Sequence, residues 1–367
     1  MSELKPRPRL LLGPGPSNVS YRVLRAMSTP LVGHLDPQFM EIMDQVCQLL
    51  RQTFQTKNQM TFPISGTGSA GMEAALVNTL EPGDLAIIGI NGVFGLRLCE
   101  VAQRCGAEVI SLEAEWGQPL DPGQVIETCQ AHPQAKLCAL VHAETSTGVL
   151  QPLAEIGAHL QKGDTLFLVD AVTSLGGVEL KVDEWGIDVC YSGTQKCLSV
   201  PPGLAPITFS AKALDKIAAR KSKVQSWYLD VSLLQKYWGE ERLYHHTAPI
   251  SMNYALREGL LIIQEEGLEN RFARHQEAAR RLGEGLAQMG FSFFAAQGHR
   301  LPPLTSVYPP AGWDVEGVRK ELLARHDIEV GGGLGAVAGK IWRIGLMGEN
   351  ATQKSVAILL DALKEMG

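Results

Sequence analysis

Apolar and polar positions follow two different rhythms along the chain, and the first runs from about residue 60 to about residue 210. Here short apolar runs alternate with amphipathic stretches, which is typical of strand and helix units that build a parallel sheet. The pattern predicts strands at 85–90, 107–114, 135–144, 165–172, 188–193 and 205–210, and helices such as 69–80 and 152–163. Breaks with turn chemistry separate these elements, as in EPGD at 81–84 and HPQA at 132–135.

The second rhythm begins after about residue 250, where long helices are predicted at 251–267 and 269–290. Shorter strand-like and helical segments follow at 291–295, 305–309, 314–326, 328–333 and 341–346, before a final helix. This change predicts a separate α+β domain. We therefore expect an N-terminal extension at 1–18, a large domain at 19–264 and a small C-terminal domain at 265–367. The two domains should pack together, because no low-complexity linker separates them.

The chain has 367 residues, of which 45% are hydrophobic and 20% charged, as expected of a globular protein with more than one core. Its net charge of -6, without a dense run of Lys or Arg, argues against nucleic acid as a partner. Seven cysteines without CxxC pairs indicate reduced thiols and a cytoplasmic location. No segment reaches the ~18 apolar residues of a membrane span, so we expect no membrane association.

Reactive side chains stand at three predicted strand ends, where an open parallel sheet binds its ligands. The stretch SGTGSAGMEAAL at 65–76 opens into a helix whose free N–H groups can bind phosphate, although such turns also make ordinary loops and caps. Asp170 ends an apolar strand, where a buried acid needs a cation or hydrogen-bond donors. The alternative is that Asp170 is a cap or turn residue. Lys196 follows the next strand, a position that is usual for a surface lysine.

Taken together, the three strand ends match the needs of one cofactor, pyridoxal 5'-phosphate. Its aldehyde condenses with an amine, an acid keeps its ring nitrogen protonated, and its phosphate binds at a helix N-terminus. Lys196, Asp170 and the 65–76 stretch offer these three groups. The sequence therefore predicts a pyridoxal phosphate site in which Lys196 holds the cofactor.

A series of motifs extends this prediction to nearly the whole chain. They are LGPGPSNV (12–19), SGTGS (65–69), ETSTGVLQPL (144–153), VDAVTSLGG (169–177), SGTQK (192–196), YHHTAP (244–249) and WRIGL (342–346). With these motifs the chain resembles the class V aminotransferases, specifically the alanine:glyoxylate and serine:pyruvate group. The resemblance implies an α/β protein of the pyridoxal-phosphate-dependent transferase fold type I. Its large domain would hold a mostly parallel seven-stranded sheet, beside a smaller α+β C-terminal domain.

The resemblance also implies the residues of the cofactor pocket. They are Thr67, Gly68 and Ser69 at the phosphate, Phe94 stacked on the ring, Thr145 near the phenolic oxygen, Asp170 at the ring nitrogen, Val172 under the ring, Gln195 on the phosphate side and Lys196. Some relatives have tryptophan in place of Phe94, and phenylalanine keeps the stacking face but loses the indole N–H. A core aromatic residue at a helix start is the alternative interpretation of Phe94.

Three further residues are expected to complete the site. The resemblance implies that Tyr244 and Thr247 reach the phosphate of the neighbouring subunit, which makes the protein a homodimer with shared sites; the alternative is a polar loop with capping roles. Arg343 lies inside an apolar strand, where it would clamp the substrate's α-carboxylate or form an internal ion pair with a glutamate. The adjacent His245 and His246 lack a recognisable third ligand, so no metal site is predicted.

The implied reaction moves an amino group from alanine or serine to glyoxylate or pyruvate by a ping-pong mechanism, with Lys196 as general base at the substrate Cα. One alternative is a cysteine desulfurase-like lyase, which needs a reactive cysteine late in the chain, but no cysteine follows Cys197. The other is a catalytically silent relative that acts as an assembly subunit. Such a subunit need not bind the cofactor.

Overall fold

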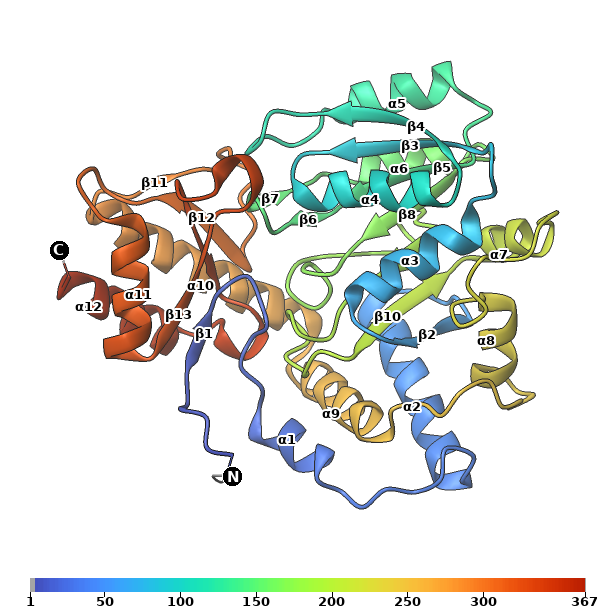
Figure 1. Cartoon of the computed structure of the whole chain (residues 1–367), viewed down its shortest axis with the longest axis horizontal. Helices are drawn as coiled ribbons and strands as arrows, with labels where there is room; N and C mark the ends of the chain where they lie inside the picture. Colours follow the sequence, from blue (N-terminus) through green and yellow to red (C-terminus); the bar gives the residue numbers. More distant parts are fainter. Residues whose placement is uncertain (1–3, 367) are drawn as a thin grey trace.

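The computed structural model describes residues 4–366 and contains two main sheets, each covered by helices (Figure 1). The larger sheet has seven strands in the order β2-β10-β9-β8-β5-β3-β4. Pairing is parallel from β9 through β8, β5 and β3 to β4, whereas β10 is antiparallel to both β9 and β2. The expectation of a mostly parallel seven-stranded sheet is confirmed. Its strands are β2 (Met60–Ser65), β3 (Leu85–Ile90), β4 (Glu108–Glu113), β5 (Leu137–Val141), β8 (Leu166–Asp170), β9 (Val189–Tyr191) and β10 (Leu204–Phe209).

The two faces of this sheet form different hydrophobic cores, because alternate residues along a strand point to opposite sides. Ile88 packs in one core with α3 and α4, whereas its neighbour Ile87 packs in the other with α5, α6 and α9. Burial on both faces explains why the inner strands are continuous apolar runs. The helices around the sheet are α1 (Tyr21–Met27), α2 (Pro37–Phe54), α3 (Gly68–Thr79), α4 (Val93–Arg104), α5 (Pro122–Ala131), α6 (Ala154–Leu160), α7 (Ala211–Ala218), α8 (Val231–Trp238) and α9 (Ile250–Glu266).

The smaller sheet has the order β1-β13-β14-β12-β11 and shares a core with α10 and α12. Its first strand comes from the expected N-terminal extension and pairs in parallel with β13. Gly267, with a φ of 80°, separates α9 from α10, and we propose this break as the domain boundary expected near residue 265. The elements are β1 (Leu10–Leu12), α10 (Leu268–Gln288), β11 (Ser292–Phe293), β12 (Leu304–Tyr308), α11 (Val315–His326), β13 (Ile328–Gly332), η1 (Gly335–Val337), β14 (Trp342–Gly345), η2 (Gly348–Asn350) and α12 (Gln353–Lys364).

Two strands of the larger sheet differ from the prediction. The predicted strand at 135–144 is divided, because the chain leaves the sheet after β5 and β6 (Ala143–Glu144) pairs instead with β7 (Val149–Leu150). Strand β2 has no counterpart among the predicted strands. It contains Pro63, which is unusual in a sheet, and it accommodates the proline as an edge strand. The division of 135–144 matters for function, since it turns the residues after Val141 into a loop beside the sheet's carboxyl edge.

Within residues 4–366, none of the helices is both long and apolar enough to cross a membrane.

Candidate active site

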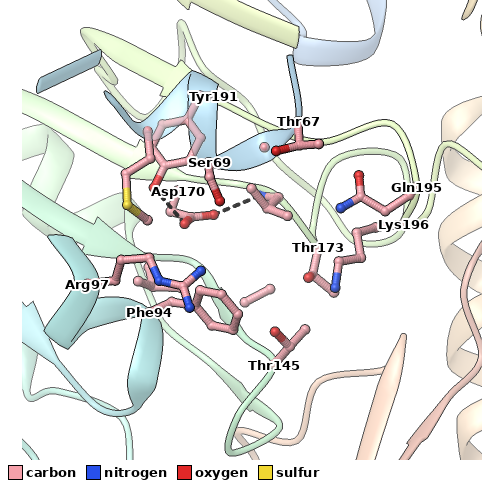
Figure 2. A pocket seen from close by; sticks show the side chains of 15 residues that line it. Thr67, Ser69, Phe94, Arg97, Thr145, Asp170, Thr173, Tyr191, Gln195 and Lys196 are labelled. Carbon is pink, nitrogen blue, oxygen red and sulfur yellow. Dashed lines mark hydrogen bonds between the residues drawn. The ribbon is translucent and has the colours of Figure 1, made fainter. Parts of the chain in front are cut away.

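A cavity of about 150 Å³ opens at the carboxyl ends of the central parallel strands (Figure 2). It brings together every residue predicted for the cofactor pocket except Tyr244 and Thr247. Its lining consists of Thr67, Gly68, Ser69, Met72, Phe94, Arg97, Val141, Ala143, Thr145, Asp170, Val172, Thr173, Tyr191, Gln195 and Lys196. Because the lining comes from the last residues of the central strands and from the loops and helices that follow β2, β3, β5, β8 and β9, the parallel order of the sheet is what assembles the site.

Lys196 lies in the turn after β9, and only 9% of its surface is exposed. Its ammonium group donates a hydrogen bond to the carbonyl of Pro14, so the N-terminal GPGP turn closes one side of the cavity. A side chain at Gly15 would push the lysine out of place, since its Cβ would stand 2.7 Å from Lys196 Cδ. Burial, together with the nearby Arg343 guanidinium, lowers the pKa of Lys196 to about 8. An amine with this pKa is partly neutral near pH 7 and can act as a nucleophile or base.

Asp170 is the last residue of β8 and is almost fully buried. Its Oδ1 accepts a hydrogen bond from the Val172 N–H (2.8 Å), and its Oδ2 accepts one from the Tyr191 hydroxyl (2.6 Å), both drawn in Figure 2. Burial raises the pKa of Asp170, and the two hydrogen bonds oppose that shift. The role of Tyr191 was absent from the sequence prediction. Its place at the end of β9, in register with Asp170, could have indicated this contact.

The N-terminus of α3 forms another part of the cavity wall. Thr67 caps this helix with its backbone only, so its hydroxyl and the first N–H groups are free to bind an anion. Gly68 packs so closely on Val172 that an added Cβ would stand 3.2 Å from that side chain. The buried Gln195 Oε1 has no hydrogen-bond partner within the described chain. The free donors at the start of α3 fit the phosphate of the expected cofactor, whereas Gln195 could bind that phosphate only through its Nε2 amide group and not through the unpaired oxygen.

Phe94 begins α4 and faces the cavity while it also packs against the core, so both interpretations of this residue describe part of its environment. Arg97, one turn later, places its guanidinium carbon 5.0 Å from the centre of the Phe94 ring. This contact is a cation–π interaction that orients the ring. Arg97 was absent from the sequence prediction. The sequence could have indicated Arg97, because it follows Phe94 by three positions and a helix places both side chains on one face.

Glu144 is a fully buried carboxylate next to the cavity, and it too was absent from the prediction. It accepts hydrogen bonds from the Ser146 N–H (3.0 Å) and from the Phe94 N–H (3.1 Å). Glu144 therefore joins the start of α4 to the loop that carries Thr145. Burial raises the pKa of Glu144 to about 7, although the hydrogen bonds from Ser146 favour the charged form.

This raised pKa predicts an unusual pH dependence of stability. Above the ordinary pKa of 4.5 and up to about 7, the folded protein binds the Glu144 proton more tightly than the unfolded chain does, so stability is lost as pH rises. Relative to the Glu144→Gln variant, the wild type should lose roughly 3 kcal/mol of unfolding free energy across this range. Denaturant unfolding of both proteins at the two ends of the range measures the difference. Parallel pH profiles would contradict it, and Glu155→Gln, at an exposed acid, is the control.

Arg343 lies in β14 behind the Thr145 loop, with 6% of its surface exposed. Its Nε donates to the Gly332 carbonyl (2.7 Å) and its Nη1 to the Thr145 carbonyl (3.1 Å). Burial lowers its pKa to about 10, and the charge of Glu144 opposes this shift. No ion pair to Arg343 is present within residues 4–366. The guanidinium thus remains available to a carboxylate ligand.

Tyr244 and Thr247 lie outside the cavity of their own chain, on the exposed loop between α8 and α9. Between them, His245 and His246 bond to each other through their Nδ1 atoms (2.9 Å), and His246 Nε2 lies 2.7 Å from Ser65 Oγ. Across residues 4–366 no cluster of three or more His, Cys, Asp or Glu side chains could hold a metal.

Comparison with known proteins agrees with this geometry. A family model described as aminotransferase class-V matches residues 14–358. The (S)-ureidoglycine--glyoxylate transaminase of Bacillus subtilis is 46% identical, over 97% of this chain and 90% of its own length. The alanine--glyoxylate aminotransferase of Rattus norvegicus is 44% identical, over 97% of this chain and 87% of its own length. The crystal structure of an alanine--glyoxylate aminotransferase from Nostoc sp. has a TM-score of 0.97 and 49% identity, covering 100% of this chain and 97% of the other.

Proposed function

The chain belongs to the class-V aminotransferase family and is a transaminase, and we propose that its cavity holds pyridoxal 5'-phosphate on Lys196. The observation that carries the proposal is the meeting of a buried lysine, a buried strand-end aspartate and an open helix N-terminus in one cavity. When bound, this cofactor supplies a protonated aromatic ring that withdraws electrons from the substrate Cα. The chain's own side chains then have to hold the ring, the phosphate and the substrate.

Each of these tasks has a residue at a suitable place. The Asp170 carboxylate would hold the proton on the ring nitrogen, while Thr67 to Ser69 and Gln195 would bind the phosphate. Phe94 and Val172 would enclose the ring from its two faces, and the Thr145 hydroxyl would bond its phenolic oxygen. Arg343 would bind the substrate carboxylate, since it is buried and its hydrogen-bond partners among residues 4–366 are carbonyl groups.

Lys196 has a second task as the base that moves the substrate's proton. Its lowered pKa keeps part of the amine neutral, so Nζ can accept the proton from the substrate Cα. The same group can then donate the proton in the later step that completes the transfer of the amino group. These steps run forward with an amino acid and then in reverse with a 2-oxo acid, which gives ping-pong kinetics. Cys197 offers no rival chemistry, because burial raises its pKa to about 12 and its thiol donates to the Thr173 carbonyl.

The chain transfers an amino group between a small amino acid and a small 2-oxo acid, and we propose glyoxylate as the acceptor. Both curated relatives are named as glyoxylate aminotransferases, which supports this choice. Alanine or serine is our first proposal for the donor. (S)-Ureidoglycine is the second candidate, because one of the two curated relatives is named for it.

A half-reaction experiment tests the function and the donor together. Purified protein loaded with pyridoxal phosphate is mixed with L-alanine, L-serine, (S)-ureidoglycine or ethylamine, and its visible absorbance is followed in single turnovers. The true donor should bleach the absorbance, and glyoxylate added afterwards should restore it. Ethylamine should react at least about 100-fold more slowly, because it offers Arg343 no carboxylate. Absence of visible absorbance in the loaded protein would instead favour a catalytically silent relative. Recovery of the absorbance only when both substrates are present together would contradict the ping-pong order.

We infer that the active unit is a homodimer in which Tyr244 and Thr247 serve the neighbouring site. Large apolar side chains are exposed on the same part of the chain, including Trp227 (62%) and Leu243 (51%), and such a patch marks a surface for association. Light scattering should give twice the mass of the chain, whereas a fully active monomer would contradict the inference.

A cytoplasmic location is also proposed, since all seven cysteines are buried free thiols. Cell fractionation followed by immunodetection tests it, and recovery from a secreted fraction would contradict it.

A further inference from the structure

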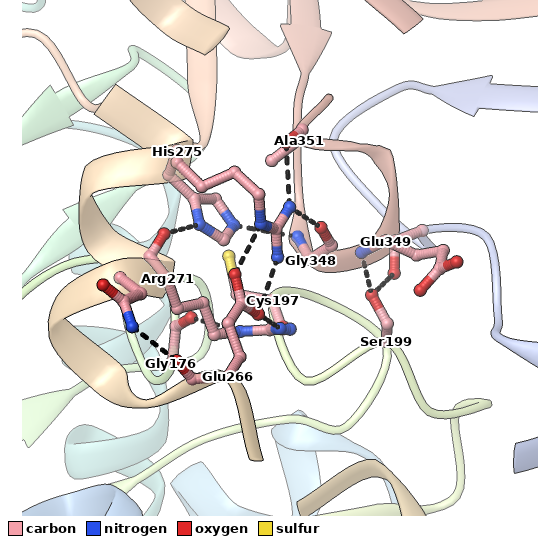
Figure 3. A network of polar contacts seen from close by, with 12 residues as sticks. Gly176, Cys197, Ser199, Glu266, Arg271, His275, Gly348, Glu349 and Ala351 are labelled. Carbon is pink, nitrogen blue, oxygen red and sulfur yellow. Dashed lines mark hydrogen bonds and ion pairs between the residues drawn. The ribbon is translucent and has the colours of Figure 1, made fainter. Parts of the chain in front are cut away.

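A second set of polar contacts, outside the cavity, joins α10 to the segment that carries Lys196 (Figure 3). We call it the α10 network, and it consists of Glu266, Arg271, Arg274 and His275 with the groups they contact in Gly176, Cys197, Gly348 and Ala351. Figure 3 shows Cys197 between the helix and the turn that follows β14. None of these side chains lines the cavity, so the network can affect the reaction only through the backbone that it holds.

Arg271 is the buried centre of the network, with 3% of its surface exposed. Its Nη2 donates to the Cys197 carbonyl (2.6 Å) and its Nε to the Gly176 carbonyl (2.9 Å). Its Nη1 binds the Glu266 carboxylate (2.7 Å), which balances the buried charge. Cys197 follows Lys196 directly, and Gly176 lies in the loop after β8. One side chain of α10 therefore binds two of the loops that carry predicted cofactor residues, those after β8 and β9.

The other contacts of the segment after the lysine are hydrogen bonds between neutral groups. The Cys197 thiol donates to the Thr173 carbonyl (3.1 Å), and Ser199 Oγ accepts from the Glu349 N–H (2.8 Å). Within residues 4–366, Arg271 is the charged side chain that donates to the backbone of this segment. Charge-assisted hydrogen bonds are about twice as strong as neutral ones, so the Arg271 contact should dominate the position of this backbone.

His275 continues the network to the strand of Arg343. Its Nδ1 lies 2.7 Å from the Arg271 carbonyl, and its Nε2 accepts from the Gly348 N–H (2.9 Å). This pattern requires a neutral ring with the proton on Nδ1, and burial accordingly lowers the pKa of His275 to about 3. Gly348 stands in the turn after β14, which carries Arg343. A continuous series of bonds thus connects the backbone beside Lys196 to the strand of Arg343.

We propose that Arg271 is a positioning residue for Lys196, which holds the amine at the correct place relative to Arg343. This inference rests on the proposed function, in which Lys196 moves a proton at the substrate Cα while Arg343 binds the carboxylate. Lys196 follows a strand of the larger sheet and Arg343 lies in a strand of the smaller sheet, so their spacing depends on contacts that cross between the two sheets. A displacement of about 1 Å between reacting groups lowers kcat by about 100-fold, whereas uniform substrate binding is little affected.

The test compares two arginines of α10 that share the Glu266 carboxylate. Arg274 also binds Glu266 (2.6 Å), but it donates to Gly348 and Ala351 and not to the segment after Lys196. In R271K a single ammonium group keeps the charge but cannot reach all three acceptors of the guanidinium fork. We expect R271K to lower kcat at least about 10-fold with the donor KM within about threefold, and R274K to keep kcat within about threefold of wild type.

Two readouts other than activity separate positioning from general destabilisation. In the loaded protein, the pH midpoint of the visible absorbance should move by at least about half a unit in R271K and stay in place in R274K, because only R271K weakens a contact with the backbone beside Lys196. In cofactor-free protein, deuterium exchange of the peptide covering 193–203 should be faster in R271K than in R274K. Equal exchange and equal midpoints in the two variants would overturn the proposal.

A further variant keeps the test decisive if R271K does not fold. Glu266→Gln weakens the anchor of Arg271 while leaving its donors in place, and it should produce the same changes at smaller size; a wild-type absorbance midpoint and exchange rate would overturn the proposal. Failure of the proposed function looks different, because the wild-type protein would then show no visible absorbance with pyridoxal phosphate. The exchange comparison needs no cofactor and still tests Arg271 in that case.

Discussion

Replacing Lys196 by alanine should abolish the visible absorbance of protein mixed with pyridoxal phosphate and lower kcat/KM at least about 10³-fold. The variant loses both the amine that binds the cofactor covalently and the base at the substrate Cα, and a general base alone contributes about 10² to 10⁴-fold. Absorbance spectra and steady-state rates with alanine and glyoxylate measure the two losses separately. A variant that keeps both its colour and its turnover would show that the lysine is assigned wrongly.

The Lys196→Ala variant has a matched control and a chemical rescue. Lys181 is a surface lysine held by Glu179 and Glu184, so Lys181→Ala should behave as the wild type. A small free amine such as methylamine should restore part of the lost rate in Lys196→Ala, since it can enter the space left by the side chain and accept the proton. Rescue that is equally large in the wild type would argue against this explanation.

Replacing Asp170 by asparagine should lower kcat by about 10³-fold while the protein still binds the cofactor. The amide is nearly the same shape, so it can keep the hydrogen bonds with Val172 and Tyr191, but it carries no charge to stabilise a proton on the ring nitrogen. The lysine and the phosphate contacts remain, which is why we expect colour without much turnover. Single-turnover rates with alanine give the size of the effect, and a rate within threefold of wild type would refute the role.

Tyr191→Phe is a milder variant that affects the same carboxylate. Burial raises the pKa of Asp170, and the Tyr191 hydroxyl is the hydrogen bond that opposes this most strongly. Without the hydroxyl, the carboxylate should hold its own proton up to higher pH, so the rate should fall by about 10-fold and recover partly as pH rises. A loss that does not depend on pH would mean that Tyr191 acts through packing only.

The sequence predicted the centre of the site because strand ends are readable from local patterns. Asp170 and Lys196 each follow an apolar run, and parallel strands bring their carboxyl ends to one edge, so the structure places both in one cavity. The motif order predicted the family, and the family model and the relatives confirmed it. Division of the 135–144 strand was missed, because an apolar run shows where a strand can form but not where the chain leaves the sheet.

What the sequence determined by itself is therefore most of the strands of the large sheet, their order along the chain and the reactive residues at strand ends, since all of these depend on neighbours a few positions away. Only the tertiary structure decided which other groups contact these residues. Tyr191 donates a hydrogen bond to Asp170, Glu144 accepts one from the Phe94 N–H, and Arg271 donates one to the carbonyl of the residue after Lys196. Periodicity tells which face of a helix is buried, but it does not name the partner across the interface. A buried arginine such as Arg271 is visible in the sequence as one more charge on a helix, and packing alone gives it three acceptors and a place beside the lysine.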